Sequence, residues 1–250
     1  MSDSLLAGVV CVLTTGGQPV GTGFVVGEDE GLVATCAHVV EGAGAGPGKE
    51  AEVTVRFHSG GGQEEQRAEV VPAWWRASDA EDVAILRLQG PLPADARPLP
   101  LGPAAETTGH TVYAFGFPTL GTLGGLWGKG EVVGLVADAG RSLLQLRSSE
   151  ITAGFSGGPV WDEEAGLVIG MATSITHPDQ FGRLGETAFA TPAEVLQQVC
   201  PDLSLRTTPA ARRVASGDRE GLERALGMAC RSLFILEEQA AGFGKGRIQA

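Results

Sequence analysis

Residues 154–159 have the sequence GFSGGP, in which Ser156 stands among three glycines. Glycine adopts backbone conformations that other residues avoid, so this stretch can form a tight turn that exposes the serine hydroxyl. The glycines also allow backbone N–H groups to converge on a nearby point, which is the geometry of an oxyanion hole. Taken alone, the stretch is equally compatible with a glycine-rich β-turn. A nucleophilic serine further requires a base, usually histidine, and a carboxylate that holds the base.

Two upstream segments contain a histidine and an aspartate in strand-like surroundings. Residues 32–40 read LVATCAHVV, which predicts a β-strand with His38 at its end. Residues 82–88 read DVAILRL, and Asp82 opens a predicted strand of alternating apolar residues. The candidates therefore follow one another along the chain in the order histidine, aspartate, serine.

The three segments together resemble the trypsin/chymotrypsin family of serine proteases. TCAHV is similar to the family's histidine segment, DVAILRL to its aspartate strand and GFSGGP to its nucleophile loop, and the likeness covers residues 5–200. The resemblance implies that His38 is the general base and then the general acid, that Asp82 orients its imidazole, and that Ser156 attacks the carbonyl. It also implies that the N–H groups of Gly154 and Ser156 stabilise the oxyanion.

Other acidic residues and histidines have less suitable surroundings. Asp79 and Glu81 compete with the predicted aspartate, but they precede the uninterrupted strand pattern and are expected in a solvated turn. His58 borders a run of glycines and is expected to be exposed, and His110 precedes a predicted strand. His177 is assigned to a loop near the substrate cleft. None of these histidines has a matching motif around it.

Substrate preference depends on the pocket for the side chain before the scissile bond. Glu150 lies six residues before Ser156, where the resemblance places the pocket floor and where an acid selects Arg or Lys. The alternative is that Glu150 is solvated and that other side chains line the pocket, namely Ile151, Ala172, Thr173 and Ile175. The strand at 172–175, which includes Ser174, is expected to pair with the substrate backbone by β-addition, bordered by a loop at 176–185.

The composition favours an all-β fold. The 250 residues include 38 glycines and 14 prolines, with many short apolar runs and few helical periodicities before residue 190. Strands are expected at 8–14, 20–27, 32–37, 51–58, 67–73, 83–88, 111–116, 130–137, 143–148, 158–161, 167–173 and 187–191. By the resemblance they form two six-stranded antiparallel β-barrels, at about 1–95 and 105–200, with the base in the first barrel and the nucleophile in the second.

Charge and motif content narrow the partners. The net charge of −12 argues against a nucleic-acid backbone, and the absence of CxxC and HExxH patterns leads us to expect a polypeptide substrate with no metal and no cofactor. The first ten residues have no basic stretch and are too punctuated for a signal peptide or a membrane span. We interpret the four cysteines as reduced, and Cys11 and Cys36 as small core residues, which predicts a cytoplasmic protein without membrane contact.

The end of the chain differs in composition from the rest. A short helix is expected at 191–199, and residues 201–250 are expected to form a linker and an amphipathic helical tail, because apolar residues recur at near-helical spacing within 217–241. Such a helix either packs on the barrels or docks a partner protein or a further domain through residues 207–250.

Family members that are activated by cleavage have an aspartate directly before the nucleophile, which pairs with the new N-terminus. This chain has Phe155 there, which predicts no activation by N-terminal cleavage. The leading hypothesis is a serine endopeptidase that forms an acyl-enzyme, either on its own or as a regulated module of a larger bacterial effector. The alternative is a catalytically silent protease-fold module that binds peptides or proteins in its cleft.

Overall fold

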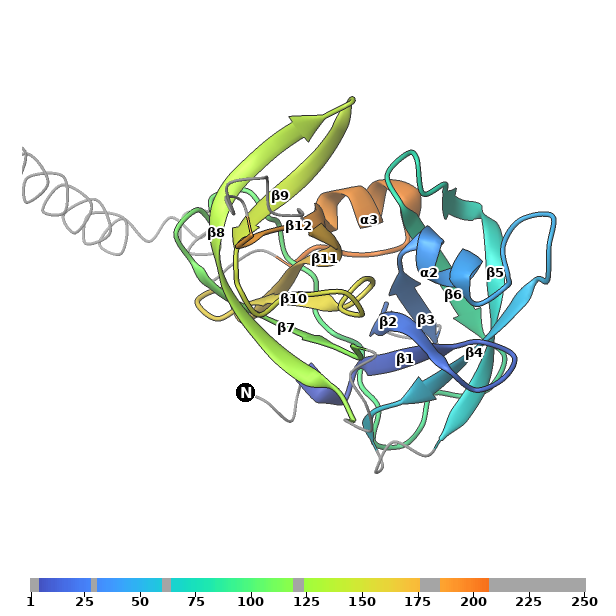
Figure 1. Cartoon of the computed structure of the whole chain (residues 1–250). Coiled ribbons are helices and arrows are strands. Elements are labelled where there is room, and N and C mark those ends of the chain that lie inside the picture. The colour runs from blue at the N-terminus through green and yellow to red at the C-terminus, as the bar shows by residue number, and fades with distance from the viewer. Residues whose placement is uncertain (1–4, 28–30, 60–63, 119–123, 176–184, 207–250) are drawn as a thin grey trace, which may run out of the picture. The chain divides into compact units, whose positions relative to one another are not determined.

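The computed structural model describes residues 5–27, 31–59, 64–118, 124–175 and 185–206. Within these ranges the chain forms two closed antiparallel barrels of six strands each (Figure 1). The expected all-β fold of two six-stranded barrels is therefore confirmed. His177, the loop at 176–185 except its last residue, Cys230 and the predicted tail helix lie outside the described residues.

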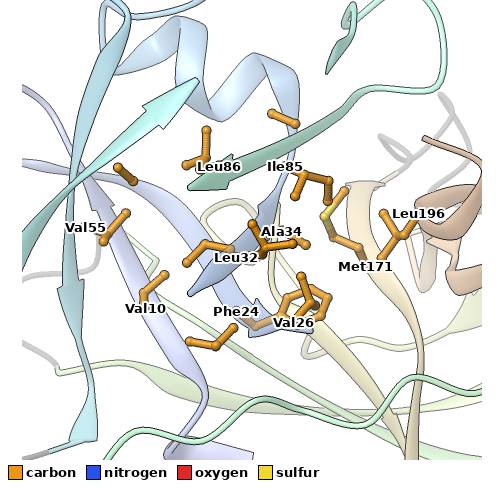
Figure 2. Close-up of a cluster of buried hydrophobic side chains, with 14 of the residues drawn as sticks. Val10, Phe24, Val26, Leu32, Ala34, Val55, Ile85, Leu86, Met171 and Leu196 are labelled. Atoms are coloured by element: carbon orange, nitrogen blue, oxygen red, sulfur yellow. The ribbon is translucent and has the colours of Figure 1, made fainter. Parts of the chain in front are cut away.

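The first barrel is closed in the order β1-β2-β3-β6-β5-β4. Its strands are β1 (Val9–Leu13), β2 (Pro19–Val26), β3 (Leu32–Thr35), β4 (Glu52–Phe57), β5 (Glu65–Arg76) and β6 (Val83–Leu88). Valine, leucine and isoleucine dominate β1, β3 and β6, and this preference for branched side chains suits a pleated, buried surface. Figure 2 shows the resulting core, in which Phe24, Leu32 and Leu86 are buried side chains of the first barrel.

The second barrel is closed in the order β10-β11-β12-β9-β8-β7. Its strands are β7 (Thr111–Gly116), β8 (Leu126–Asp138), β9 (Arg141–Arg147), β10 (Pro159–Asp162), β11 (Leu167–Ile175) and β12 (Thr187–Pro192). Its core contains Leu144, Leu146, Val160 and Ile169. The strands β8 and β9 form a long hairpin that extends beyond the barrel (Figure 1), and Leu135 on its outer face is exposed.

The described part of the chain also contains the short helices α2 (Ala37–Gly42) and α3 (Ala193–Val199), and Leu5 and Leu6 are helical as well. The expected short helix at 191–199 is present as α3. Its Leu196 lies beside Met171, and both belong to the buried cluster that forms the core of the first barrel (Figure 2). Neither helix is long and apolar enough to cross a membrane, and this statement covers the described residues alone.

One local expectation was wrong. Strand β3 ends at Thr35, and His38 lies in the first turn of α2 rather than at the end of a strand. The expected strand at 32–37 stops two residues early, and the chain turns into a helix whose Val39 and Val40 are buried in the core. Tertiary burial therefore overrides the local β preference.

Candidate active site

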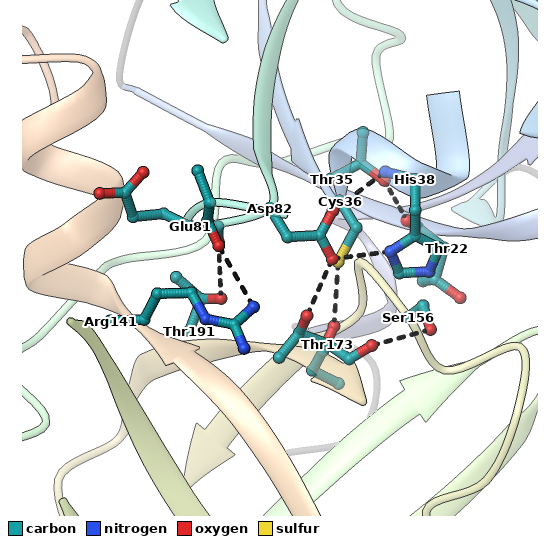
Figure 3. A network of polar contacts seen from close by, with 12 residues as sticks. Thr22, Thr35, Cys36, His38, Glu81, Asp82, Arg141, Ser156, Thr173 and Thr191 are labelled. Atoms are coloured by element: carbon teal, nitrogen blue, oxygen red, sulfur yellow. Dashed lines mark hydrogen bonds and ion pairs between the residues drawn. The ribbon is translucent and has the colours of Figure 1, made fainter. Parts of the chain in front are cut away.

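His38 and Asp82 form a tightly held pair in the first barrel. Asp82 directly precedes β6, and its Oδ2 accepts a hydrogen bond of 2.7 Å from Nδ1 of His38 (Figure 3). Its Oδ1 accepts a second hydrogen bond of 3.0 Å from the backbone N–H of His38. The carboxylate thus holds both the ring and the backbone of the histidine. In the neutral imidazole the proton is on Nδ1, so Nε2 is unprotonated and is the basic atom.

The carboxylate of Asp82 also accepts a hydrogen bond of 3.0 Å from the hydroxyl of Thr173. The side chain of Asp82 is only 8% exposed, whereas that of His38 is 40% exposed. Burial alone disfavours the charged carboxylate, but the hydrogen bonds from His38 and Thr173 and the charge of His38 outweigh it, so the pKa of Asp82 is lowered. The aspartate therefore stays ionised beneath a histidine that reaches the surface.

Ser156 lies on the loop between β9 and β10 and joins the same hydrogen-bond network. Its hydroxyl donates to the carbonyl of Thr173 at 3.3 Å, and Thr173 in turn donates to Asp82 (Figure 3). Among the hydrogen bonds of the described residues, none joins Ser156 to His38. The structure therefore brings the three predicted residues to one place, with the serine hydroxyl turned toward Thr173.

The backbone around Ser156 requires glycine at two positions. Gly154 has φ of +95°, and a Cβ there would lie 2.4 Å from Cα of Pro118. Gly157 has φ of +83°, and a Cβ there would lie 2.0 Å from the carbonyl oxygen of Thr22. Among the described residues no acceptor bonds the N–H of Gly154 or of Ser156. These two N–H groups are the predicted oxyanion donors.

Phe155 anchors this loop through apolar contacts. Its side chain is 1% exposed and belongs to the core of the second barrel. Two glycines on neighbouring strands make room for it: a Cβ at Gly116 would lie 2.7 Å from Cγ of Phe155, and a Cβ at Gly128 would lie 3.1 Å from its Cε1. The ring therefore fills a notch between β7 and β8. It stands at the position where family members that are activated by cleavage have an aspartate.

Only two of the predicted specificity residues, Thr173 and Ser174, line the pocket that lies beside His38 and Asp82. Glu150 is exposed, and its Oε2 accepts a hydrogen bond of 2.8 Å from the backbone N–H of Lys129. Ile151 and Ala172 are buried in the core of the second barrel, and the hydroxyl of Thr173 is bound to Asp82. This placement agrees with a solvated Glu150, but Ile151 and Ala172, which the same alternative assigned to the pocket, are buried in the core. Ser174 is exposed and Ile175 is half-buried at the end of β11.

A pocket of about 880 Å³ lies beside His38 and Asp82, between the two barrels. Glu81 lines it on one side, and Arg141, Leu143 and Phe189 line it on the other. We expected Glu81 in a solvated turn, but it is half-buried here. The β8–β9 hairpin builds the far wall, and Arg141 reaches across to donate a hydrogen bond of 3.2 Å to the carbonyl of Ala80. No motif in the sequence of this hairpin indicated that it reaches the site.

The remaining described histidines lie outside this network. The expectation that His58 is exposed was wrong: it is half-buried, and its ring lies 4.9 Å from that of Phe115 and 6.0 Å from that of Phe117. Burial lowers the pKa of His58. His110 donates a hydrogen bond of 2.7 Å to the buried carboxylate of Asp162 in the second barrel. Both contacts depend on distant strands and have no local sequence signal.

Cys36 is the one described cysteine beside the candidate triad. Its Sγ and ligand atoms of His38 and Asp82 lie within 4.8 Å of one another, and no other such group of three occurs in the described ranges. However, the 2.7 Å between Nδ1 and Oδ2 is shorter than the roughly 3.3 Å that separates two ligands on one tetrahedral zinc ion. Burial, and then the charge of Asp82, raises the pKa of the Cys36 thiol well above its usual value, so the thiol stays protonated and donates to the carbonyl of Ala172 at 3.4 Å. The cluster suits hydrogen bonding better than metal binding.

Sequence reasoning missed two residues that hold this site together and one role of a third. Thr22 and Thr35 are buried and hydrogen-bonded behind the nucleophile loop. Thr173, expected to line a substrate pocket, lines the pocket beside His38 and also donates a hydrogen bond to the carboxylate of Asp82. The only local signal for Thr22 is its place between Gly21 and Gly23.

Comparisons with known proteins give a consistent result. A family model described as trypsin-like peptidase domain matches residues 21–171. The chain is similar to the solved structure of the active form of the Rv3671c protease from M. tuberculosis, with 26% identity, a TM-score of 0.60, and coverage of 82% of this chain and 84% of that chain. It is also similar to the inactive form of the same protease, with 25% identity, a TM-score of 0.57, and coverage of 80% of this chain and 90% of that chain. A third similar structure is the inactive form of a serine-to-alanine mutant from M. tuberculosis H37Rv, with 25% identity, a TM-score of 0.58, and coverage of 80% of this chain and 87% of that chain. None of the curated proteins matches this sequence.

Proposed function

Because the chain belongs to the trypsin-like peptidase family, we propose that it is a serine endopeptidase that cleaves polypeptides through an acyl-enzyme on Ser156. The observation that carries this proposal is the hydrogen-bond network in which Asp82 holds His38 while Thr173 links Asp82 to Ser156. Such a network supplies a base, its orienting carboxylate and a hydroxyl from one junction between the barrels.

In the proposed reaction, Nε2 of His38 takes the proton of the Ser156 hydroxyl while Oγ forms a bond to the substrate carbonyl carbon. The carbonyl π electrons move to the oxygen, and the N–H groups of Gly154 and Ser156 stabilise that charge. The C–N bond then breaks, and the leaving amine takes the proton from His38. Water repeats the sequence on the ester and releases the acid. No step requires a metal or a cofactor.

Substrate binding has a specific consequence for the serine. On the side of β10, β11 is hydrogen-bonded as far as Ala172, whose N–H donates to Gly158 and whose carbonyl accepts from Gly157, so this edge of β11 beyond Ala172 is not covered by β10. An extended substrate that pairs there would present an N–H to the Thr173 carbonyl, which the Ser156 hydroxyl occupies in this structure. We therefore expect substrate to displace the hydroxyl from Thr173 toward His38.

A second candidate function rests on the same hydrogen bond. If the Ser156 hydroxyl stays on the Thr173 carbonyl, that carbonyl does not pair with a peptide, and the fold would bind peptides only farther along β11, without cleaving them. This is the catalytically silent binding module, and it shares every residue with the peptidase except an activated serine.

A fluorophosphonate probe separates the two functions, because it reacts with an activated serine beside a formed oxyanion site. We expect the full chain to be labelled, and Ser156→Ala and His38→Ala to be unlabelled at equal folded fraction. A folded wild-type chain that takes no label but still binds an extended peptide would favour the silent module instead.

A further inference from the structure

One residue of the first barrel contacts the nucleophile loop of the second on both sides of Phe155. Thr22 in β2 is 0% exposed, and its hydroxyl donates to the carbonyl oxygen of Gly154 at 2.9 Å. The same hydroxyl accepts a hydrogen bond of 3.2 Å from the backbone N–H of Phe117. The backbone N–H of Thr22 donates to the carbonyl oxygen of Ser156 at 2.9 Å. A single threonine therefore holds both residues whose N–H groups form the proposed oxyanion hole.

Thr22 is itself fixed from the strand that leads to His38. The hydroxyl of Thr35, also fully buried, donates to the carbonyl oxygen of Thr22 at 2.7 Å. Thr35 ends β3, three residues before His38. A continuous series of hydrogen bonds thus runs from the segment of the base to the loop of the nucleophile.

Gly154 needs such support because its own backbone has little steric preference. Without a Cβ, it adopts left-handed and right-handed φ values about equally well. Its N–H and its carbonyl are joined through two rotatable bonds, so a fixed carbonyl limits the directions in which the N–H can point. The N–H of Phe155 is held separately by the carbonyl of Thr152 at 3.1 Å. The carbonyl of Gly154 also accepts a hydrogen bond of 3.1 Å from the N–H of Phe117, which is shared with the Thr22 hydroxyl. The peptide unit between Gly154 and Phe155 is therefore bound at both of its polar atoms, and Thr22 supplies one of the two bonds to its carbonyl.

We propose that Thr22 is a positioning residue for the oxyanion hole, acting through the carbonyl of Gly154; this inference rests on the proposed peptidase function. It contacts no substrate. Its hydroxyl selects the orientation of the loop in which the N–H groups of Gly154 and Ser156 point to one site. The hydroxyl lowers the energy of the transition state, where the oxyanion exists, more than that of bound substrate.

The test uses full-length Thr22→Val, which keeps the shape and removes the hydroxyl, and Thr22→Ser, which keeps the hydroxyl. Thr107→Val is the matched control, because Thr107 is 3% exposed and its hydroxyl donates to the carbonyl of Ala104 at 2.7 Å, outside the site. We expect Thr22→Val to lower kcat roughly 10- to 100-fold with little change in KM. Phenylboronic acid forms a tetrahedral adduct with the serine, and we expect its binding affinity to fall by a similar factor. Thr22→Ser should stay within about threefold of wild type, and Thr107→Val should lower Tm without lowering kcat.

Two results would overturn the inference in an active enzyme. One is a Thr22→Val variant with wild-type kcat and boronate affinity. The other is a Thr22→Ser variant as impaired as Thr22→Val, which would assign the effect to packing of the methyl group.

A wild-type chain that neither cleaves peptides nor takes the fluorophosphonate label would refute the proposed function instead. The role of Thr22 is then judged from the ¹H–¹⁵N resonance of Gly154, which reports the loop without catalysis. A resonance that moves in Thr22→Val but stays in place in Thr107→Val supports the inference, and an unmoved resonance in Thr22→Val contradicts it.

Discussion

The two barrels have the same strand order but hold their candidate catalytic side chains by different means. Read from β7, the second barrel closes as β7-β8-β9-β12-β11-β10, which matches β1-β2-β3-β6-β5-β4 of the first. The first barrel offers a histidine and an aspartate held by direct side-chain and backbone hydrogen bonds. The second offers Ser156 on a glycine-rich loop, which is anchored by the buried ring of Phe155 and by a hydrogen bond from Thr22 of the first barrel. A shared topology therefore gives one rigid pair and one loop that must be held from outside.

The largest effect is expected where the rigid pair is broken. Asp82→Asn should lower kcat by roughly 10⁴-fold, because an amide at this position no longer selects the Nδ1–H tautomer of His38. The rate of acylation measured with an ester substrate reports this loss. Asp79→Asn, an exposed change three residues earlier, is the control and should leave the rate at the wild-type value. Equal rates in Asp82→Asn and wild type would remove Asp82 from the mechanism.

The second test asks whether the nucleophile loop depends on its buried ring. Phe155→Ala empties the notch beside Gly116 and Gly128. It should lower the free energy of unfolding by about 3–5 kcal/mol, and it should also lower kcat. Phe57→Ala is the matched change in the core of the first barrel, where the ring is also fully buried. It should cost similar stability while the folded fraction keeps its kcat. Urea unfolding and kcat per folded molecule distinguish the two, and parallel losses of kcat would contradict the contrast between the barrels.

A smaller effect is expected where His58, directly after β4, contacts Phe115 in β7 and Phe117 directly after β7. Burial lowers the pKa of His58 in the folded state below its usual value of 6.5, so folding disfavours its protonation. Stability is therefore complete above pH 6.5 and is lost as the pH falls through the lower, folded pKa. The variant His58→Phe cannot take up a proton at this position. The urea midpoint of His58→Phe minus that of wild type should therefore be larger at pH 5 than at pH 8. A difference that does not change with pH would show that His58 is not responsible.

The smallest effect concerns the end of the chain. We propose that residues 207–250 contact a partner protein or a further domain, a role that their amphipathic pattern supports. All residues of the candidate site lie before Arg206, within one compact unit of the chain. A protein ending at Arg206 should therefore cleave a peptide substrate within about twofold of the full-length rate. A much faster truncated protein would mean that the tail inhibits the enzyme.

Local patterns predicted the strands and the three motif residues, but not the contacts between the barrels. The strand at 83–88 and the order of His38, Asp82 and Ser156 were readable because alternation and glycine turns are local features. The contact of Thr173 with Asp82, across 91 residues of sequence, depends on how the barrels meet. The same holds for Thr22 and Gly154, which lie 132 residues apart. His38 in α2 was misjudged for a related reason, since burial of Val39 and Val40 outweighs their β preference.

The core of the first barrel is not completed by the first barrel alone. Its buried cluster includes Met171 from β11 and Leu196 from α3. During synthesis, which proceeds from the N-terminus, a nascent chain must therefore emerge past Leu203, the last residue of that cluster, before the cluster can close. Because His38, Asp82 and Ser156 meet along the same boundary, a partly made chain exposes apolar surface but cannot assemble the site. Incomplete products are thus candidates for aggregation or degradation and do not release an active fragment.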